Sequence, residues 1–128
     1  MNTELFYLTL SAGLCAIMWT PYVVARLQSW GLTAAVGYPD DPPATPAWSQ
    51  RAQRAHANMV ENLVPFAALV LVAQAAGVST EMTALGATLF FWGRVAHALV
   101  FVLGIPWART LAFVVSTVGL LLIFFALI

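Results

Sequence analysis

Hydrophobic residues in this chain form four long runs, separated by one long polar stretch and two short turns. The runs extend roughly over residues 5–27, 51–76, 82–103 and 109–128. Each is close to the ~20 residues that an α-helix needs to cross the hydrocarbon core of a membrane. We therefore expect an all-α membrane protein. The two short turns make neighbouring helices antiparallel. The expected fold is an up-down bundle of four transmembrane helices, forming a single domain over residues 1–128.

The stretch from Gln28 to Gln50 is the long polar connection. It contains the run Tyr38-Pro39-Asp40-Asp41-Pro42-Pro43 and then Pro46. Since proline is excluded from helix interiors, we expect an extended and fairly stiff segment here, and a kink at Pro21 in the first span. The two aspartates either cover the positive rim of a cavity or form a solvated turn, which is the commoner role of such residues.

The composition agrees with a membrane protein. Hydrophobic residues make up 62% of the chain and charged residues 8%, far from the averages of soluble domains. The formal net charge of zero gives no indication of a nucleic-acid partner. The single cysteine, Cys15, excludes a disulfide within the chain, and we interpret it as a small packing residue.

All five basic residues are arginines, and their distribution predicts the topology. Arg26, Arg51, Arg54 and Arg109 lie near the loops that join spans one to two and three to four. The opposite side, which carries both termini, has no arginine. The positive-inside rule therefore predicts that both termini are non-cytoplasmic. The compact chain with short termini indicates an integral protein of a bacterial inner (plasma) membrane.

Polar residues in the second span fall on one side of the expected helix. At 100° per residue, His56 points away from this polar stripe. Ionisable groups are costly against lipid, so the stripe is expected to face a polar cavity, a partner helix or a bound ligand. The stripe consists of Arg51, Arg54, Asn58, Glu61 and Asn62.

Arg94, His97 and Phe101 share one face of the third span. Arg94 lies roughly 14 Å from the end of the helix at 1.5 Å per residue, where inserting an arginine costs about 2.5–3.5 kcal/mol. One interpretation is a structural ion pair with Glu61, at a comparable depth on the second span. The other is an anionic ligand, because Glu61 is the only carboxylate within the membrane to balance the arginines.

The ligand interpretation suggests a small zwitterion with more than one carboxylate. Glu61 would meet its ammonium group, and Asn58 would bond a peptide-like amide. Arg109 is either a topology anchor at the membrane interface or a cation beside a thiol. A free thiol has a pKa near 8.5 and is weakly nucleophilic at neutral pH; lowering this pKa by two units requires about 2.7 kcal/mol.

The two histidines do not predict a metal site, because they lie on different helices without a third ligand at suitable spacing. We expect His97 to hydrogen-bond a neighbouring helix or the ligand, and His56 to support helix packing or capping. Small residues predict close helix contacts. They are Gly86, Gly93, Ser116 and Gly119 on the third and fourth spans, and Ala67, Ala68 and Ala75 on the second.

The polar motifs resemble a known family. Arg51-x-x-Arg54-Ala55-His56-x-Asn58-x-x-Glu61-Asn62-x-x-Pro65-Phe66 is similar to the second-helix signature of the MAPEG superfamily, the membrane-associated proteins in eicosanoid and glutathione metabolism. Gly93-Arg94-Val95-Ala96-His97 resembles the third helix of its prostaglandin E synthases. Arg109-Thr110-Leu111-Ala112-Phe113 resembles the start of the fourth helix in its microsomal glutathione transferases. The similarity covers nearly the whole chain.

The resemblance implies a homotrimer with three glutathione sites between adjacent subunits, and glutathione as co-substrate. It implies a transferase or peroxidase that acts on hydrophobic electrophiles or lipid hydroperoxides, with Arg109 as the catalytic residue that stabilises the glutathione thiolate. Arg26 would contribute from a neighbouring subunit. The residues expected to bind glutathione are Arg26, Arg54, Asn58, Glu61, Arg94 and His97.

The chain departs from the family pattern at Phe101, where the enzymes usually carry a tyrosine whose hydroxyl helps to bind glutathione. Losing a hydrogen bond to a charged group costs about 1.5–3 kcal/mol. Ala57 also replaces a basic or bulkier residue of some members, and the connection from Phe101 to Arg109 is slightly shorter than in the prostaglandin synthases. The alternative is therefore a non-catalytic lipid- or glutathione-binding scaffold of the same family. A small transporter is a third option, without the inverted repeats common in transporters.

Overall fold

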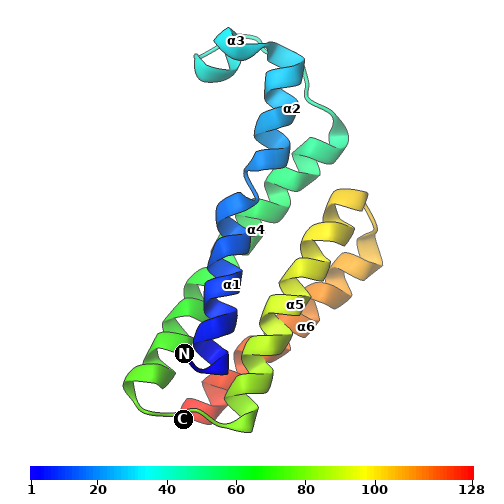
Figure 1. The fold of residues 1–128 in the computed structure, drawn as a ribbon. Helices are drawn as coiled ribbons and strands as arrows, with labels where there is room; N and C mark the ends of the chain where they lie inside the picture. Colours follow the sequence, from blue (N-terminus) through cyan, green and yellow to red (C-terminus); the bar gives the residue numbers. More distant parts are fainter.

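The chain forms six α-helices and no strands in a computed structural model that describes residues 1–128 (Figure 1). Four helical stretches are long and apolar enough to cross a membrane, which confirms the expected all-α membrane fold. The first of these stretches, Thr3–Trp30, consists of two helices in sequence. The helices are α1 (Thr3–Ile17), α2 (Thr20–Trp30), α3 (Leu32–Val36), α4 (Ala47–Ala75), α5 (Glu81–Leu103) and α6 (Pro106–Leu127).

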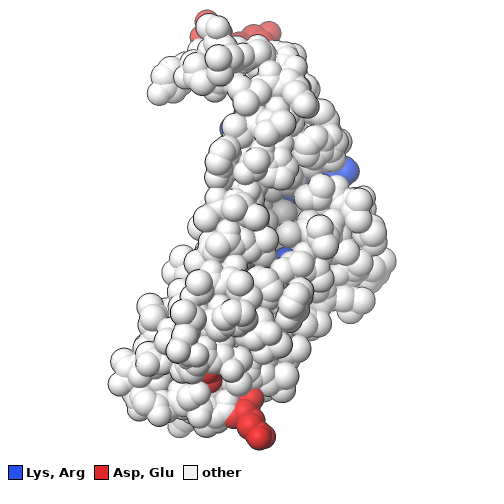
Figure 2. Space-filling view, in the orientation of Figure 1, with Lys and Arg blue, Asp and Glu red and all other residues white.

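The helices form two halves that diverge along the molecule. The α1–α2 stretch runs beside α4, and α5 forms a closely packed hairpin with α6 (Figure 1). The halves meet at the end that carries both termini and separate toward the opposite end, where α2 and α4 extend past the α5–α6 loop (Figure 1). We call this opposite end, which carries Arg26, Arg51, Arg54 and Arg109, the arginine end. The space-filling view shows a hollow between the two halves (Figure 2).

The break in the first span lies one turn earlier than the expected kink at Pro21. Helix α1 ends at Ile17, and α2 begins at Thr20 with Pro21 in its first turn. Proline has no N–H, so Pro21 cannot donate to the carbonyl of Ile17 four residues before it. The missing hydrogen bond belongs to the preceding turn, and the helix is therefore interrupted there.

Helices at the arginine end are longer than the apolar runs. Helix α4 starts at Ala47 rather than Arg51, and α6 starts at Pro106 rather than Arg109. Both starts are set by proline: Pro46 is the N-cap of α4, and Pro106 occupies the first turn of α6, where its fixed φ favours a helix. The lengths of the apolar runs alone did not predict these starts, because the prolines determine where the two helices begin.

The connection between α2 and α4 differs in part from the extended segment that was expected. It includes the short helix α3 after Gly31, whose φ of 79° is accessible to glycine without steric cost. Asp40 and Asp41 are exposed, and acidic atoms lie at the tip of the molecule beyond the arginine end (Figure 2). This position matches the solvated turn and not the cover of a cavity.

Close packing of α5 against α6 depends on glycine. A Cβ atom on Gly86 would lie 2.5 Å from the carbonyl oxygen of Gly119, and one on Gly93 would lie 2.8 Å from the backbone nitrogen of Ser116. The predicted close contacts at these four residues are therefore confirmed. On α4, by contrast, Ala68 and Ala75 are exposed and Ala67 is half-buried.

The end that carries the termini contains a buried carboxylate that the sequence did not indicate. Glu4 is 2% exposed and accepts hydrogen bonds from the hydroxyls of Ser79 and Thr83. Thr83 also completes a capping box with Thr80 at the start of α5. These bonds join α1 to the α4–α5 turn and help fix the end from which the two halves diverge. A lone glutamate in the first turn of a helix is too common to predict this contact.

Substituting Gly119 by alanine is expected to destabilise the protein by about 1–3 kcal/mol, because the added methyl group would meet the backbone of α5. Gly13→Ala is the matched control: nothing lies within 4 Å of a Cβ there, and alanine favours the helix. Thermal unfolding in detergent would measure both. Equal stability of the two variants would contradict the close packing of α5 on α6.

Candidate functional site

Arg94 is the centre of the polar site. It lies on α5 directly after Gly93, and it is 1% exposed although it carries a full charge. Its Nη2 donates to the side-chain oxygen of Asn58 at 2.6 Å. Nε and Nη1 are buried and have no hydrogen-bond partner. Buried polar groups are normally satisfied, so two unpaired donors on a buried guanidinium indicate a place for an additional acceptor.

Asn58 is oriented toward Arg94 by its own helix. Asn62, one turn further along α4, donates its amide to the backbone carbonyl of Asn58 at 2.8 Å and approaches the side-chain oxygen at 3.4 Å. The same oxygen of Asn58 accepts the hydrogen bond from Arg94. The two asparagines were predicted to share a helix face. Asn62 bonds to Asn58 on this face of α4, and Asn58 makes the hydrogen bond to Arg94 of α5.

His97 continues the polar site along α5. Its Nδ1 lies 3.4 Å from Arg94 Nη2, and because arginine has only donors, this nitrogen of His97 is the acceptor. The imidazole ring packs against Phe101, with centroids 5.3 Å apart, and faces Phe113 of α6 at 6.4 Å. His97 therefore accepts a hydrogen bond from Arg94 of its own helix. Its contact with α6 is with an aromatic ring, that of Phe113.

Arg109 contacts Phe101 from α6. It is exposed at the start of α6, and its guanidinium carbon is 4.9 Å from the centroid of the Phe101 ring. A cation over an aromatic face is attracted by the negative face of the ring. Asn58, Arg94, His97, Phe101 and Arg109 thus form a contiguous series of contacts from α4 through α5 to α6.

Arg51 has a structural contact that the sequence did not predict. Its Nε donates to the backbone carbonyl of Val102 at 2.9 Å, which joins α4 to the end of α5. This end is closed by Gly104, whose φ of 77° is the left-handed conformation typical of a helix C-cap. The polar stripe included Arg51, but the carbonyl partner is a backbone atom and leaves no pattern in the sequence.

Arg26 and His56 belong to a second group of contacts, between α2 and α4. The hydroxyl of Tyr22 lies 2.8 Å from Nδ1 of His56, and the guanidinium of Arg26 lies over the rings of Tyr22 and Trp30 at 5.2 and 5.7 Å. His56 therefore packs one helix on another, as expected from the sequence. Arg26 does not contact Arg94 or Arg109 within the chain.

Arg54 and Glu61 are both exposed on α4. Neither takes part in the contacts of Arg94, whose partners are Asn58 and His97. The structural ion pair between Arg94 and Glu61, left open by the sequence, does not form within the chain. Of the six predicted glutathione-binding residues, the structure brings together Asn58, Arg94 and His97, close to the predicted catalytic Arg109.

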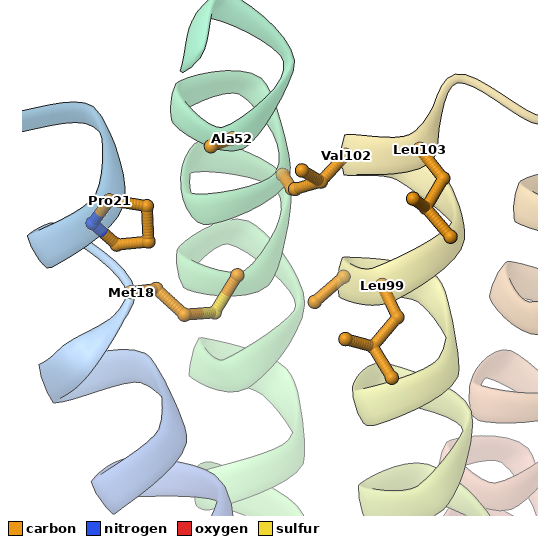
Figure 3. A pocket seen from close by; sticks show the side chains of 8 residues that line it. Met18, Pro21, Ala52, Leu99, Val102 and Leu103 are labelled. Atoms are coloured by element: carbon orange, nitrogen blue, oxygen red, sulfur yellow. The ribbon is translucent and has the colours of Figure 1, made fainter. Parts of the chain in front are cut away.

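An apolar cavity of about 330 Å³ lies between the two halves (Figure 3). Three alanines leave the space open, and the break between α1 and α2 supplies one wall (Figure 3). Figure 2 shows arginine atoms deep in the hollow between the halves. Val102, which lines the cavity, is also the residue whose carbonyl binds Arg51. The lining residues are Met18, Pro21, Ala52, Ala55, Ala98, Leu99, Val102 and Leu103.

The sequence was also compared with known protein families. A model of the MAPEG family matches residues 9–128, almost the entire chain. The chain therefore belongs to the MAPEG family, and its four apolar helices make it an integral membrane protein. No curated protein and no solved structure matches the chain.

Replacing Asn58 by leucine is expected to lower stability by about 1–3 kcal/mol, because a buried charged donor would lose its acceptor. Asn58→Asp keeps an acceptor of similar size and adds an opposite charge, so this variant is expected to unfold at or above the wild-type temperature. Thermal unfolding without ligand would compare the two. If aspartate destabilised as much as leucine, the hydrogen bond to Arg94 would not be what stabilises this contact.

Proposed function

We propose that this protein is a glutathione-dependent membrane transferase or peroxidase. Glutathione enters from the arginine end and binds with its carboxylates at the arginines. Its thiol loses a proton beside Arg109, and the thiolate sulfur attacks a hydrophobic electrophile from the bilayer. In conjugation, a carbon–sulfur bond forms as the leaving group departs or the double bond accepts a proton. In peroxide reduction, a second glutathione closes the disulfide as water and the alcohol leave.

The buried guanidinium of Arg94 is the observation that carries the proposal. Its Nε and Nη1 have no partner, and its two contacts, with Asn58 and His97, are with neutral acceptors. A charge buried in this way is costly unless it is paired. A carboxylate of glutathione would supply an acceptor for one of these two nitrogens and the opposite charge in the same group.

Arg54 and Glu61 support a binding site completed by other subunits. Both are exposed on α4, in a helix long and apolar enough to cross a membrane. Exposed charges in such a helix are costly against lipid, so a second copy of the chain is the favoured cover. We propose the homotrimer of the MAPEG family, with glutathione between subunits. Arg54 and Glu61 of one subunit, and Arg26 of its neighbour, would then contact the ligand.

Arg109 is suited to stabilise a thiolate. It lies at the start of α6, is exposed, and is held at one side by an aromatic ring rather than by a carboxylate. Its positive charge is therefore not neutralised within the protomer. We propose that the arginine end faces the cytoplasm, as the positive-inside rule predicts, which gives the site access to soluble glutathione.

Arg109→Ala is expected to reduce the conjugation rate by a factor of roughly 10² to 10³, the usual effect of removing one donor from a developing anion. The absorbance of the bound glutathione thiolate, followed by stopped flow, should decrease with it. Arg109→Lys is expected to restore part of both, because it keeps the charge. An alanine variant with unchanged thiolate absorbance and rate would contradict the role of Arg109.

The alternative is a scaffold of the same family that binds glutathione or lipid without turnover, favoured by Phe101 in place of the usual tyrosine. Wild-type protein that binds glutathione but shows no thiolate absorbance, and no reaction with a panel of electrophiles and hydroperoxides, would establish this alternative.

The apolar cavity is proposed to hold the hydrophobic part of the electrophile, since pockets of a few hundred Å³ with apolar walls are typical of small-molecule sites. Ala98→Leu would fill part of the cavity and is expected to raise KM for long-chain 2-alkenals several-fold more than for short ones. Ala96→Leu adds the same atoms at an exposed position on α5 and serves as the control. Equal effects on long and short substrates would exclude this location.

A further inference from the structure

The side chain of Arg109 has one specific contact in the protomer, the ring of Phe101 at 4.9 Å. No carboxylate holds the guanidinium, and the residue is exposed at the first turn of α6. A long arginine side chain loses considerable rotamer freedom when it is fixed in one position. Without a contact of this kind, Arg109 would spread over many conformations, including those that reach toward the membrane interface.

Phe101 is itself fixed by the buried part of the site. It lies one turn after His97, with the two ring centroids 5.3 Å apart. His97 is 4% exposed and lies 3.4 Å from the buried guanidinium of Arg94. The ring of Phe101 is therefore fixed relative to Arg94. Arg109, which belongs to α6, contacts this fixed ring of α5.

We infer that Phe101 is a positioning residue, which holds Arg109 over the glutathione site through its aromatic face. This inference rests on the proposed function. The attraction between a cation and an aromatic ring arises from the face of the ring and does not require a hydroxyl. A phenylalanine at this position thus retains a role in catalysis that is separate from the hydrogen bond of a tyrosine.

The test compares Phe101→Leu, which removes the aromatic face, with Phe101→Tyr, which retains it. The first measurement needs no ligand: the NMR shift of the Arg109 Nε–H, assigned by its loss in Arg109→Lys. Ring current should displace this signal in the wild type and in Phe101→Tyr. The displacement should disappear in Phe101→Leu. Phe125→Leu, a substitution of an exposed phenylalanine near the C-terminus of α6, is the control.

The second measurement is the pH dependence of the absorbance of bound thiolate. Phe101→Leu should move the midpoint upward by about one pH unit and reduce kcat about tenfold, because one pKa unit corresponds to a tenfold change in ionisation. KM for glutathione should change less than kcat. Phe101→Tyr should retain the wild-type midpoint within a few tenths of a unit. A merely structural role would change stability but would not move this profile.

The outcomes separate this inference from the proposed function. If the wild type forms no thiolate, the proposed function fails, while the NMR comparison still tests the contact between Phe101 and Arg109. If thiolate forms in the wild type but Phe101→Leu leaves both the NMR shift and the pH profile unchanged, Phe101 does not position Arg109. If Phe101→Tyr loses the signal as fully as leucine, the aromatic face is not the cause and the inference is overturned.

Discussion

The structure depends on a guanidinium that is buried without a carboxylate. Arg94 is 1% exposed, and its only partners are an amide oxygen and an imidazole nitrogen. A buried charge of this kind destabilises the fold unless the surrounding groups accept hydrogen bonds from it. Asn58 and His97 satisfy part of this requirement from α4 and α5. Nε and Nη1 of Arg94 have no partner, which is why we propose that an anionic ligand binds here.

The proposed ligand site lies where the two halves diverge, beside the closely packed hairpin of α5 and α6. Helices α5 and α6 approach closely where glycines meet, and Glu4 secures the end that carries the termini. At the arginine end, α2 and α4 separate from this hairpin (Figure 1). The apolar cavity lies there, between the two halves (Figure 3). Polar donors and apolar walls therefore lie at neighbouring positions, as the proposed reaction between a thiolate and a lipid-soluble electrophile requires.

Much of the fold was predictable because an apolar run of about 20 residues predicts a membrane-spanning helix. The four long helices followed from the length of these runs. The glycine contacts and the shared face of Arg94 and His97 followed from residue size and helical spacing. The helix starts at Ala47 and Pro106 did not, since they are set by Pro46 and Pro106 and not by the length of the apolar runs. Residue spacing also does not predict contacts with backbone atoms, such as that of Arg51 with Val102. The same holds for contacts between residues far apart in the sequence, such as Tyr22 and His56.

The central claim is that the unpaired donors of Arg94 and the surrounding arginines bind the carboxylates of a thiol peptide. Calorimetric titration of the detergent-solubilised protein would test it, with glutathione and its diethyl ester as ligands. Hydrogen bonds to charged groups contribute about 1.5–3 kcal/mol, so masking the carboxylates should weaken binding by at least about tenfold. Equal affinity for the ester, or no binding of glutathione at all, would contradict the account.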